Sequence, residues 1–275
     1  MIWERTLASE ARLAGSRIKA RSGQPAGRAL AGSAVIGALS AALALATIPG
    51  CTLEGMYKYS ETTVETKTAP LAGIDTIEMR LGAADIQVVT KEGAQAEFII
   101  EKTARASDQG ETGKLLREAE VTIEQRGSRL LVERKEKGKI KGDVIFKGFV
   151  SLDITVSVPA GIGLDVLTGS GDVVIDNRTG AIKVRSGSGD ITVEQAGQGA
   201  EVKTGSGDIR LTSGRARSLV STGSGDIFVT ELDGGLEAST GSGEINIERL
   251  SGDARLSTGS GDISVASSHG TASAQ

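Results

Sequence analysis

Cysteine is almost absent from this chain of 275 residues, since Cys51 is the only one. A single cysteine cannot form an intramolecular disulfide, so the fold has to be stabilised by burial and by backbone hydrogen bonds. Proline is also rare, with 4 residues, and there are only 7 aromatic residues. Because the 38 glycines follow no Gly-X-Y period, the sequence excludes a collagen helix and a Pro-rich disordered chain.

Basic residues are fewer than acidic residues outside the amino terminus. The first 50 residues contain 6 basic and 2 acidic residues, which leaves 25 basic and 33 acidic residues and a net charge of −8 for residues 51–275. A surface that binds the phosphates of a nucleic acid needs the opposite sign. The sequence therefore predicts no nucleic-acid partner.

A long run without charge occurs at residues 29–48, after a basic segment that ends at Arg28, and Pro49-Gly50-Cys51 follows it. This order is typical of an export signal. The segment Ile48-Pro49-Gly50-Cys51 resembles a bacterial lipoprotein cleavage site. The resemblance implies that residues 1–50 are a signal peptide, that cleavage occurs before Cys51, and that acyl chains on Cys51 anchor the protein to a membrane.

Two other interpretations of this segment stay open. The run of 20 residues is also long enough for an uncleaved membrane anchor, and Ala44-Leu45-Ala46 could be an ordinary cleavage site that leaves Cys51 as a free thiol. All three interpretations export the same domain. We therefore expect an exported protein, lipid-anchored to the bacterial cell envelope.

From Thr168 onward the chain repeats itself every 18 residues without an insertion. The six copies begin with Thr-Gly-Ser-Gly-Asp-Val at 168, Ser-Gly-Ser-Gly-Asp-Ile at 186, Thr-Gly-Ser-Gly-Asp-Ile at 204, 222 and 258, and Thr-Gly-Ser-Gly-Glu-Ile at 240. A short fixed period indicates that each unit buries its apolar face against its neighbours.

Two pairs of apolar positions recur in each repeat, and each pair is spaced by two residues as in a half-buried strand. The first pair includes Ile191 and Val193, and the second includes Ile182 and Val184. Gly-Ser-Gly turns connect them and make a helix unfavourable. The sequence predicts an all-β fold, a single-stranded β-solenoid (β-helix) with two strands in each rung of 18 residues, over residues 161–275.

The preceding segments lack the regular period. Residues 74–160 are expected to form an irregular beginning of the solenoid, since Leu81 to Val88 is a degenerate copy of the turn and strand. A short helix at 111–120 and a hairpin around 126–128 are expected to cap the first rung. Residues 51–73, which are polar and Thr-rich, are expected to form a tether.

With these repeats the chain resembles the bacterial putative-adhesin domain family of unknown function, whose cell-envelope proteins carry Gly-Ser-Gly-Asp-Ile rungs. The resemblance covers about residues 74–275, and the six turns are its most specific part. It implies a β-solenoid at the cell envelope and supplies no catalytic residues. We expect a non-catalytic lipoprotein without a cofactor that presents an adhesion, interaction or structural surface to an envelope protein or glycan.

The acidic turn residues are the strongest candidates for a site. They stack at 18-residue intervals and are Asp172, Asp190, Asp208, Asp226, Glu244 and Asp262. Calcium between rungs would relieve their repulsion, but the calcium-binding β-roll motif places a residue between Gly and Asp. We therefore expect a structural role in which each carboxylate accepts backbone N–H groups of its own turn, and no metal site. The hydroxyls at the first repeat position, such as Thr204, are expected to bond within the stack.

Several alternatives have less support. Ice binding needs a regular outward Thr array, whereas the outward seventh position varies from Arg210 to Phe228 and Asn246. A glycan-active enzyme needs converging acids and bases, yet the acids follow the turns and the only histidine, His269, lies near the end.

A basic run from Arg134 to Lys147 is expected to be a solvated hairpin loop. A bare last edge would allow the solenoid to assemble end to end.

Overall fold

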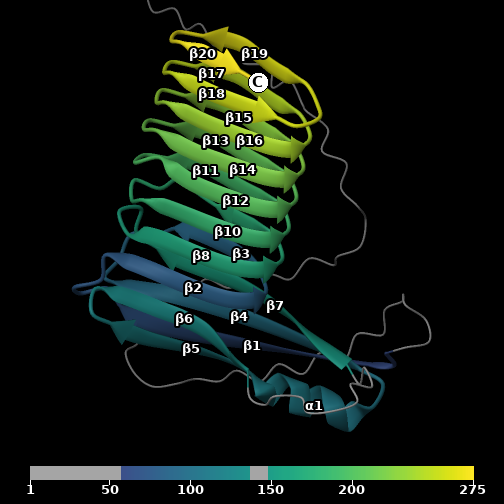
Figure 1. Ribbon diagram of the computed structural model, residues 1–275. Helices are drawn as coiled ribbons and strands as arrows, with labels where there is room; N and C mark the ends of the chain where they lie inside the picture. Colours follow the sequence, from purple (N-terminus) through teal and green to yellow (C-terminus); the bar gives the residue numbers. More distant parts are fainter. Residues whose placement is uncertain (1–56, 137–147) are drawn as a thin grey trace, which may run out of the picture. The chain divides into compact units, whose positions relative to one another are not determined.

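The computed structural model describes residues 57–136 and 148–275, which lie within one compact unit. Two ten-stranded sheets face each other, and the chain passes from one to the other in successive turns (Figure 1). This confirms the expected all-β solenoid. Cys51, the export signal and Lys137 to Lys147 of the basic run fall outside the described residues.

Sheet A is parallel throughout its regular part. Its strands, in the order in which they lie side by side, are β1 (Tyr59–Pro70), β4 (Gln95–Ala106), β7 (Gly148–Val158), β3 (Asp85–Thr90), β9 (Val173–Ile175), β11 (Ile191–Ala196), β13 (Ile209–Gly214), β15 (Ile227–Leu232), β17 (Ile245–Leu250) and β19 (Ile263–Ser268).

Sheet B lies on the other side of the core. Its strands, in the same direction along the stack, are β5 (Ala119–Arg126), β6 (Arg129–Glu136), β2 (Thr76–Ala83), β8 (Gly163–Ser170), β10 (Ile182–Ser188), β12 (Ala200–Ser206), β14 (Ser218–Ser224), β16 (Leu236–Ser242), β18 (Ala254–Thr258) and β20 (Ala272–Ala274).

Residues 18 apart lie directly opposite each other in the parallel strands. Ile191 is the partner of Ile209, which is in turn the partner of Ile227, and all three side chains are buried. In sheet B, Val184 pairs with Val202 in the same way. Parallel pairing thus produces aliphatic columns that run through one continuous core between the sheets.

The two glycines of each turn serve different purposes. Gly189, the second glycine of its turn, has φ of 128°, which favours glycine. Gly187, the first, has no positive φ; a Cβ at this position would lie 2.5 Å from the carbonyl oxygen of Gly169 in the preceding rung. The stacking distance of the turns therefore requires glycine at both positions.

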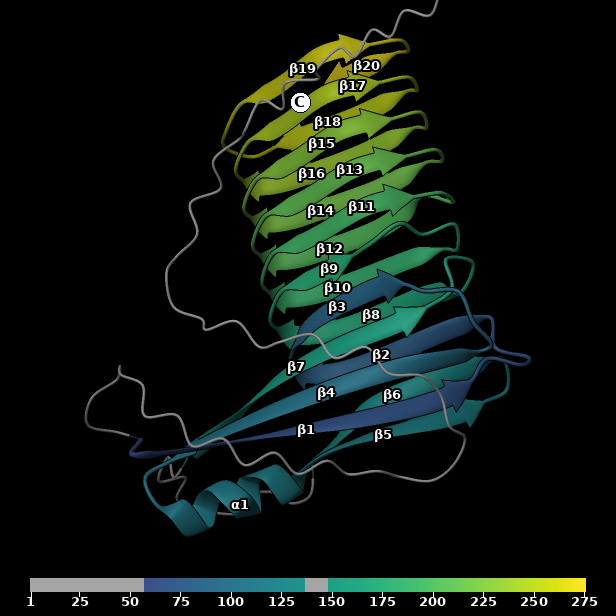
Figure 2. The ribbon, with the colours of Figure 1, turned by 180° about the vertical axis from the view of Figure 1, so that it is seen from behind.

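The irregular amino-terminal part contains the expected helix and hairpin. The helix, α1, spans Gln109–Glu118, and Asp108 caps it by accepting the N–H of Gly110 at 2.7 Å. Strands β5 and β6 form the antiparallel hairpin, and β2 and β3 pair in parallel with β8 and β9 as the degenerate first rung. Figure 2 shows α1 next to β1 and β5 at this end of the stack.

The expectation of a tether over residues 51–73 was wrong for most of that segment. Residues Tyr59–Pro70 form β1, which pairs antiparallel with β4 along its whole length. The segment alternates Thr and Glu with few apolar residues because its inner face meets polar partners. Lys102 donates to Glu65 at 2.6 Å, and Lys67 donates to the carbonyl oxygen of Val121 on β5 at 2.5 Å. These contacts close the core at the amino-terminal end.

Candidate interaction surface

The acidic residues of the repeated turns form hydrogen bonds between rungs. The Oδ1 atom of Asp172 accepts the backbone N–H of Asp190 at 2.9 Å, and Asp190 accepts the N–H of Asp208 at 2.8 Å. The same bond joins Asp208 to Asp226 and Asp226 to Glu244, each at 2.8 Å. The expectation that each carboxylate binds its own turn was therefore wrong. Parallel stacking places identical turns about 4.8 Å apart, so the N–H of the next turn lies within reach of the carboxylate.

Both ends of this aspartate ladder are visible. Asp85 extends it by one step, because its Oδ1 accepts the N–H of Asp172 at 2.9 Å. Glu244 ends it: its Oε2 accepts from Nδ2 of Asn246 at 3.3 Å, and no hydrogen bond links its carboxylate to the N–H of Asp262, although both residues are described. The additional methylene of glutamate moves the carboxylate away from the position that the aspartate oxygens occupy.

The hydroxyl groups of the turns also bond within the stack, as expected. Thr222 donates to the carbonyl oxygen of Gly207 in the preceding rung at 3.0 Å, and Thr240 donates to Gly225 at 3.0 Å. Thr204 makes the equivalent bond at 3.2 Å. The polar groups of the repeated turns therefore form hydrogen bonds that hold one rung on another.

The described residues contain no group of three or more His, Cys, Asp and Glu side chains arranged to hold a metal ion. His269 is exposed, and its backbone N–H donates to the carbonyl oxygen of Leu250 at 2.8 Å. Phe228 points outward, with the guanidinium of Arg210 5.3 Å from its ring centroid. None of the helices in the described segments is long and apolar enough to cross a membrane.

The sequence did not predict the buried cation Arg178. Arg178 is 1 % exposed, where the equivalent residues of later rungs are Ala196 and Leu232. Its Nη2 donates to the carbonyl oxygens of Pro159 at 2.8 Å and Ile162 at 2.5 Å. Desolvation by burial lowers the pKa of Arg178 to about 10. Later rungs carry a small or apolar residue at this position. The arginine in that column was therefore the sequence feature that could have predicted this residue, which holds the β7–β8 loop in place through hydrogen bonds.

The outer face of sheet B carries a network of charged side chains that the sequence period did not predict. At its centre Glu201 on β12 forms ion pairs with Lys183 at 3.0 Å and Arg185 at 3.3 Å, both on β10, and with Lys203 at 3.3 Å on its own strand. Hydrogen bonding from Lys183, opposed by desolvation and reinforced by the other two cations, lowers the pKa of Glu201 to about 2. This carboxylate is therefore ionised across the physiological pH range.

A second part of the network lies on β2 and β6. The Glu78 side chain is only 10 % exposed, and its Oε1 accepts from Nε of Arg80 at 2.6 Å while its Oε2 accepts from Nη1 of Arg129 at 3.2 Å. Hydrogen bonding from Arg80, assisted by Arg129, lowers the pKa of Glu78 despite its burial. One carboxylate thus holds two guanidinium groups on either side of it.

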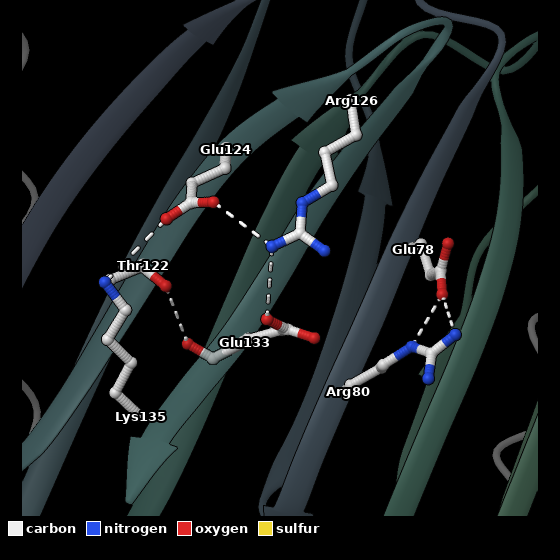
Figure 3. A network of polar contacts seen from close by, with 7 residues as sticks. All are labelled: Glu78, Arg80, Thr122, Glu124, Arg126, Glu133 and Lys135. Atoms are coloured by element: carbon white, nitrogen blue, oxygen red, sulfur yellow. Dashed lines mark hydrogen bonds and ion pairs between the residues drawn. The ribbon is translucent and has the colours of Figure 1, made fainter. Parts of the chain in front are cut away.

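The β5–β6 hairpin completes this part of the surface (Figure 3). Arg126 donates to Glu124 at 3.3 Å and lies 4.0 Å from Glu133, and Lys135 lies 3.7 Å from Glu124. A hollow of about 330 Å³ opens here, and its lining residues are Glu78, Arg80, Arg126, Arg129, Leu131 and Glu133. We call it the arginine hollow.

An adjoining hollow of about 400 Å³ shares one wall with the first, since Arg80 lines both. Its other lining residues are Leu81, Gly82, Leu167, Thr168 and Gly169. Leu167 is 46 % exposed, which is unusual for a leucine in this fold. The outer face of sheet B therefore offers a charged hollow and an apolar hollow side by side.

The chain is similar to one known protein family and to several solved structures. The family model described as Toastrack DUF4097 matches residues 74–275. No curated protein matches the chain. Solved structures with a similar chain course include one named putative adhesin from Bacteroides fragilis, with 16 % identity, a TM-score of 0.42, and coverage of 77 % of this chain and 96 % of that chain.

A structure named putative cell adhesion protein from Clostridium sporogenes has 15 % identity and a TM-score of 0.36, and covers 75 % of this chain and 99 % of its own. One named putative lipid binding protein from Parabacteroides distasonis has 16 % identity and a TM-score of 0.35, with 77 % and 95 % coverage. No functional assignment follows from likenesses at this level. The family match covers the whole solenoid and its irregular beginning, and on that match the chain belongs to the Toastrack DUF4097 family.

Proposed function

We propose that this chain is an exported, non-catalytic β-solenoid, anchored through lipid on Cys51, whose outer walls serve as an interaction surface at the bacterial cell envelope. The observation that carries the proposal is the contrast between the two sides of each wall. Inward columns such as Ile191, Ile209 and Ile227 are uniform and buried. Outward residues differ from rung to rung and hold the exposed charge.

The turn residues support a non-catalytic role because one carboxylate oxygen of each aspartate and the hydroxyl groups of the threonines already form hydrogen bonds within the stack. Asp172, Asp190, Asp208 and Asp226 each accept a backbone N–H of the next rung, and the threonines donate to the preceding one. General acid–base catalysis needs groups that are free to exchange protons with a substrate. A stack held together by these groups offers a rigid support for a surface instead.

The anchor is tested by Cys51→Ala in cells that export the protein. Metabolic labelling with radioactive palmitate should label the wild-type protein and not the variant, and the variant should leave the membrane fraction. Thr52→Ala is the control, because it alters the adjacent residue and keeps the thiol. Absence of label in the wild-type protein would refute lipid anchoring.

The interaction surface is tested by sedimentation of the full-length protein, in detergent, with purified envelope sacculi. We expect the protein to sediment with them in a salt-dependent way, because exposed charges dominate the outer face of sheet B. Replacing both Arg185 and Lys203 with glutamate should reduce the bound fraction, whereas Arg249→Glu on sheet A should not. Equal binding by all three proteins, or none by the wild type, would count against the proposal.

End-on association of two copies is a second candidate, and the last strands favour it. No strand pairs with the outer edges of β19 and β20 among the described residues, and neither strand contains a charge or a proline. Natural edges usually carry such residues to prevent pairing. Val265→Lys, which points inward, should make an associating protein monomeric by light scattering, while the outward control Ser264→Lys should not. A wild-type protein that is monomeric at every concentration would eliminate this candidate.

A further inference from the structure

We propose that the arginine hollow binds a phosphoryl group of a linear polyanion, and that cationic side chains of β10 and β12 extend this site along the stack. The inference rests on the proposed interaction function and deepens it, because it names the ligand chemistry of one wall. Five observations support it: the placement of the guanidinium groups, their free donors, the apolar floor of the hollow, the alignment of further cations, and the charge of the two faces.

The guanidinium groups are placed before any ligand arrives. Glu78 lies beneath the surface between Arg80 and Arg129, and each of its oxygens engages a different guanidinium. Arg126 approaches the same hollow from the hairpin, where Glu124 orients it. Side chains that are already ordered lose less conformational entropy when a ligand binds.

Each guanidinium retains N–H groups for a ligand. Arg129 uses Nη1 for Glu78 and Arg126 uses Nη2 for Glu124, and their Nε and second Nη make no hydrogen bond to any described residue. The side chains of Arg80, Arg126 and Arg129 are 57 %, 61 % and 61 % exposed. A guanidinium has five donors in a planar fork that matches phosphate oxygens. The hollow can therefore present donors from three sides to one tetrahedral anion.

The floor of the hollow strengthens this attraction. Leu131 points outward on β6, yet only 5 % of it is exposed because the surrounding side chains cover it. An apolar floor excludes water from one side of the site, and a lower local dielectric constant increases the energy between opposite charges. The arrangement differs from isolated surface ion pairs, which contribute little.

Further cations follow in one column of sheet B. Arg80 is the register partner of Leu167, Leu167 that of Arg185, and Arg185 that of Lys203. Neighbouring strands lie about 4.8 Å apart, so this column leads away from the hollow along the stack with cations on β2, β10 and β12. A polymer with regularly spaced negative charges fits such a column better than a single small anion does.

The two walls differ in charge. The outer face of β5, β6, β2, β8, β10 and β12 carries seven cations and six carboxylates, in a chain whose residues 51–275 have a net charge of −8. The cations are Arg80, Arg126, Arg129, Lys135, Lys183, Arg185 and Lys203; the carboxylates are Glu78, Glu120, Glu124, Glu133, Asp165 and Glu201.

Sheet A presents a group of carboxylates at the same level of the stack. Asp85, Asp153 and Glu101 face outward on three adjacent strands, with Asp153 as the register partner of both others. Burial, followed by the charges of Asp85 and Glu101, raises the pKa of Asp153. A polyanion would be repelled from this face, so the two walls together direct it to sheet B.

The test uses the full-length protein in detergent and fluorescently labelled inorganic polyphosphate, with binding followed by anisotropy. We expect binding that weakens as salt increases, and an affinity about tenfold lower for Arg126→Gln and for Arg129→Gln, which remove charge-assisted hydrogen bonds. Arg249→Gln is the matched control, because Arg249 is 58 % exposed on sheet A and pairs with Glu231 at 2.8 Å. It should bind as the wild type does. Circular dichroism and melting confirm that each variant is folded.

The outcomes separate the site from the proposed function. Loss of affinity in the two hollow variants alone supports the site, whereas equal affinity in all variants, or no polyphosphate binding, overturns it. Vesicles of phosphatidylglycerol, compared at equal phosphate, should bind less than polyphosphate; equal binding that the same variants abolish would replace the polymer with a lipid headgroup. Sedimentation with sacculi in the absence of polyphosphate binding would refute this site and leave the interaction function standing. Polyphosphate binding without sacculus binding would do the reverse.

Discussion

The break in the aspartate ladder at Glu244 makes a stabilising substitution predictable. Asp226 already binds the N–H of Glu244 at 2.8 Å, but Glu244 does not pass the bond on to Asp262. Glu244→Asp shortens the side chain by one methylene and brings a carboxylate oxygen to the position that accepts the next N–H in the four preceding turns. We expect it to create one further hydrogen bond between the last two repeated turns.

The magnitude follows from the balance of two effects. An intramolecular hydrogen bond contributes about 0.5–1.5 kcal/mol net. Stacked carboxylates about 4.8 Å apart repel by about 0.9 kcal/mol in water, and most of this repulsion is already present because Glu244 is itself charged. The net increase in the free energy of unfolding is therefore about 0.5–1 kcal/mol. The corresponding slowing of amide exchange at Asp262 is about two- to fivefold.

Hydrogen exchange at Asp262 is the appropriate assay, because unfolding of a stacked repeat protein need not be a single two-state transition. Glu248→Asp is the control: Glu248 is exposed on the same strand, β17, and lies outside the ladder. Unchanged exchange at Asp262 in Glu244→Asp, or the same slowing in the control, would show that the ladder does not stabilise the stack.

Three other perturbations test the remaining contacts. Asp208→Ala should destabilise the stack by about 1–2 kcal/mol, because it leaves the N–H of Asp226 without its acceptor; a melting temperature within error of the wild type would contradict this. Gly187→Ala should cost more, about 2–4 kcal/mol, since its Cβ would lie 2.5 Å from a backbone oxygen, whereas Gly82→Ala, with no atom within 4 Å of the added Cβ, should be tolerated in the same melting experiment. The pKa of Glu201 in the folded protein is about 2, below its ordinary value of 4.5. Its contribution to stability, about 1 kcal/mol after solvent screening, should therefore be present above pH 4.5 and disappear as the pH falls toward 2. Glu201→Gln should flatten that part of the pH–stability curve, and an unchanged curve would refute the assignment.

The regular rungs could be predicted because their period is local and repeated. Each 18-residue unit places the same residue types in the same environment, so Ile191, Ile209 and Ile227 identify one buried column without knowledge of the remaining chain. The helix at 109–118 and the β5–β6 hairpin were also predictable, because capping and turn residues mark them locally.

The candidate site was not predictable in this way. Glu78 and Arg129 meet although they are 51 residues apart, and the strands that carry them pair only because β6 joins the edge of β2. The basic run had drawn attention to Arg134 and Lys135, whereas the arginine hollow uses Arg80, Arg126 and Arg129 from separate segments. A sequence pattern shows which face of a strand is exposed, but not which strands adjoin.

The sequence by itself determined that residues 161–275 coil into stacked two-strand rungs, because apolar residues two apart and turn glycines 18 apart admit no other arrangement that buries them all. The tertiary structure determined which segments of the chain are neighbours. The Thr-rich segment at 59–70 forms a strand that pairs with β4, and the turn aspartates accept N–H groups of the next rung. Three arginines from separate segments line one hollow. These outcomes depend on contacts between segments that are distant in the sequence. Such contacts form, and contribute their free energy, only in the folded chain.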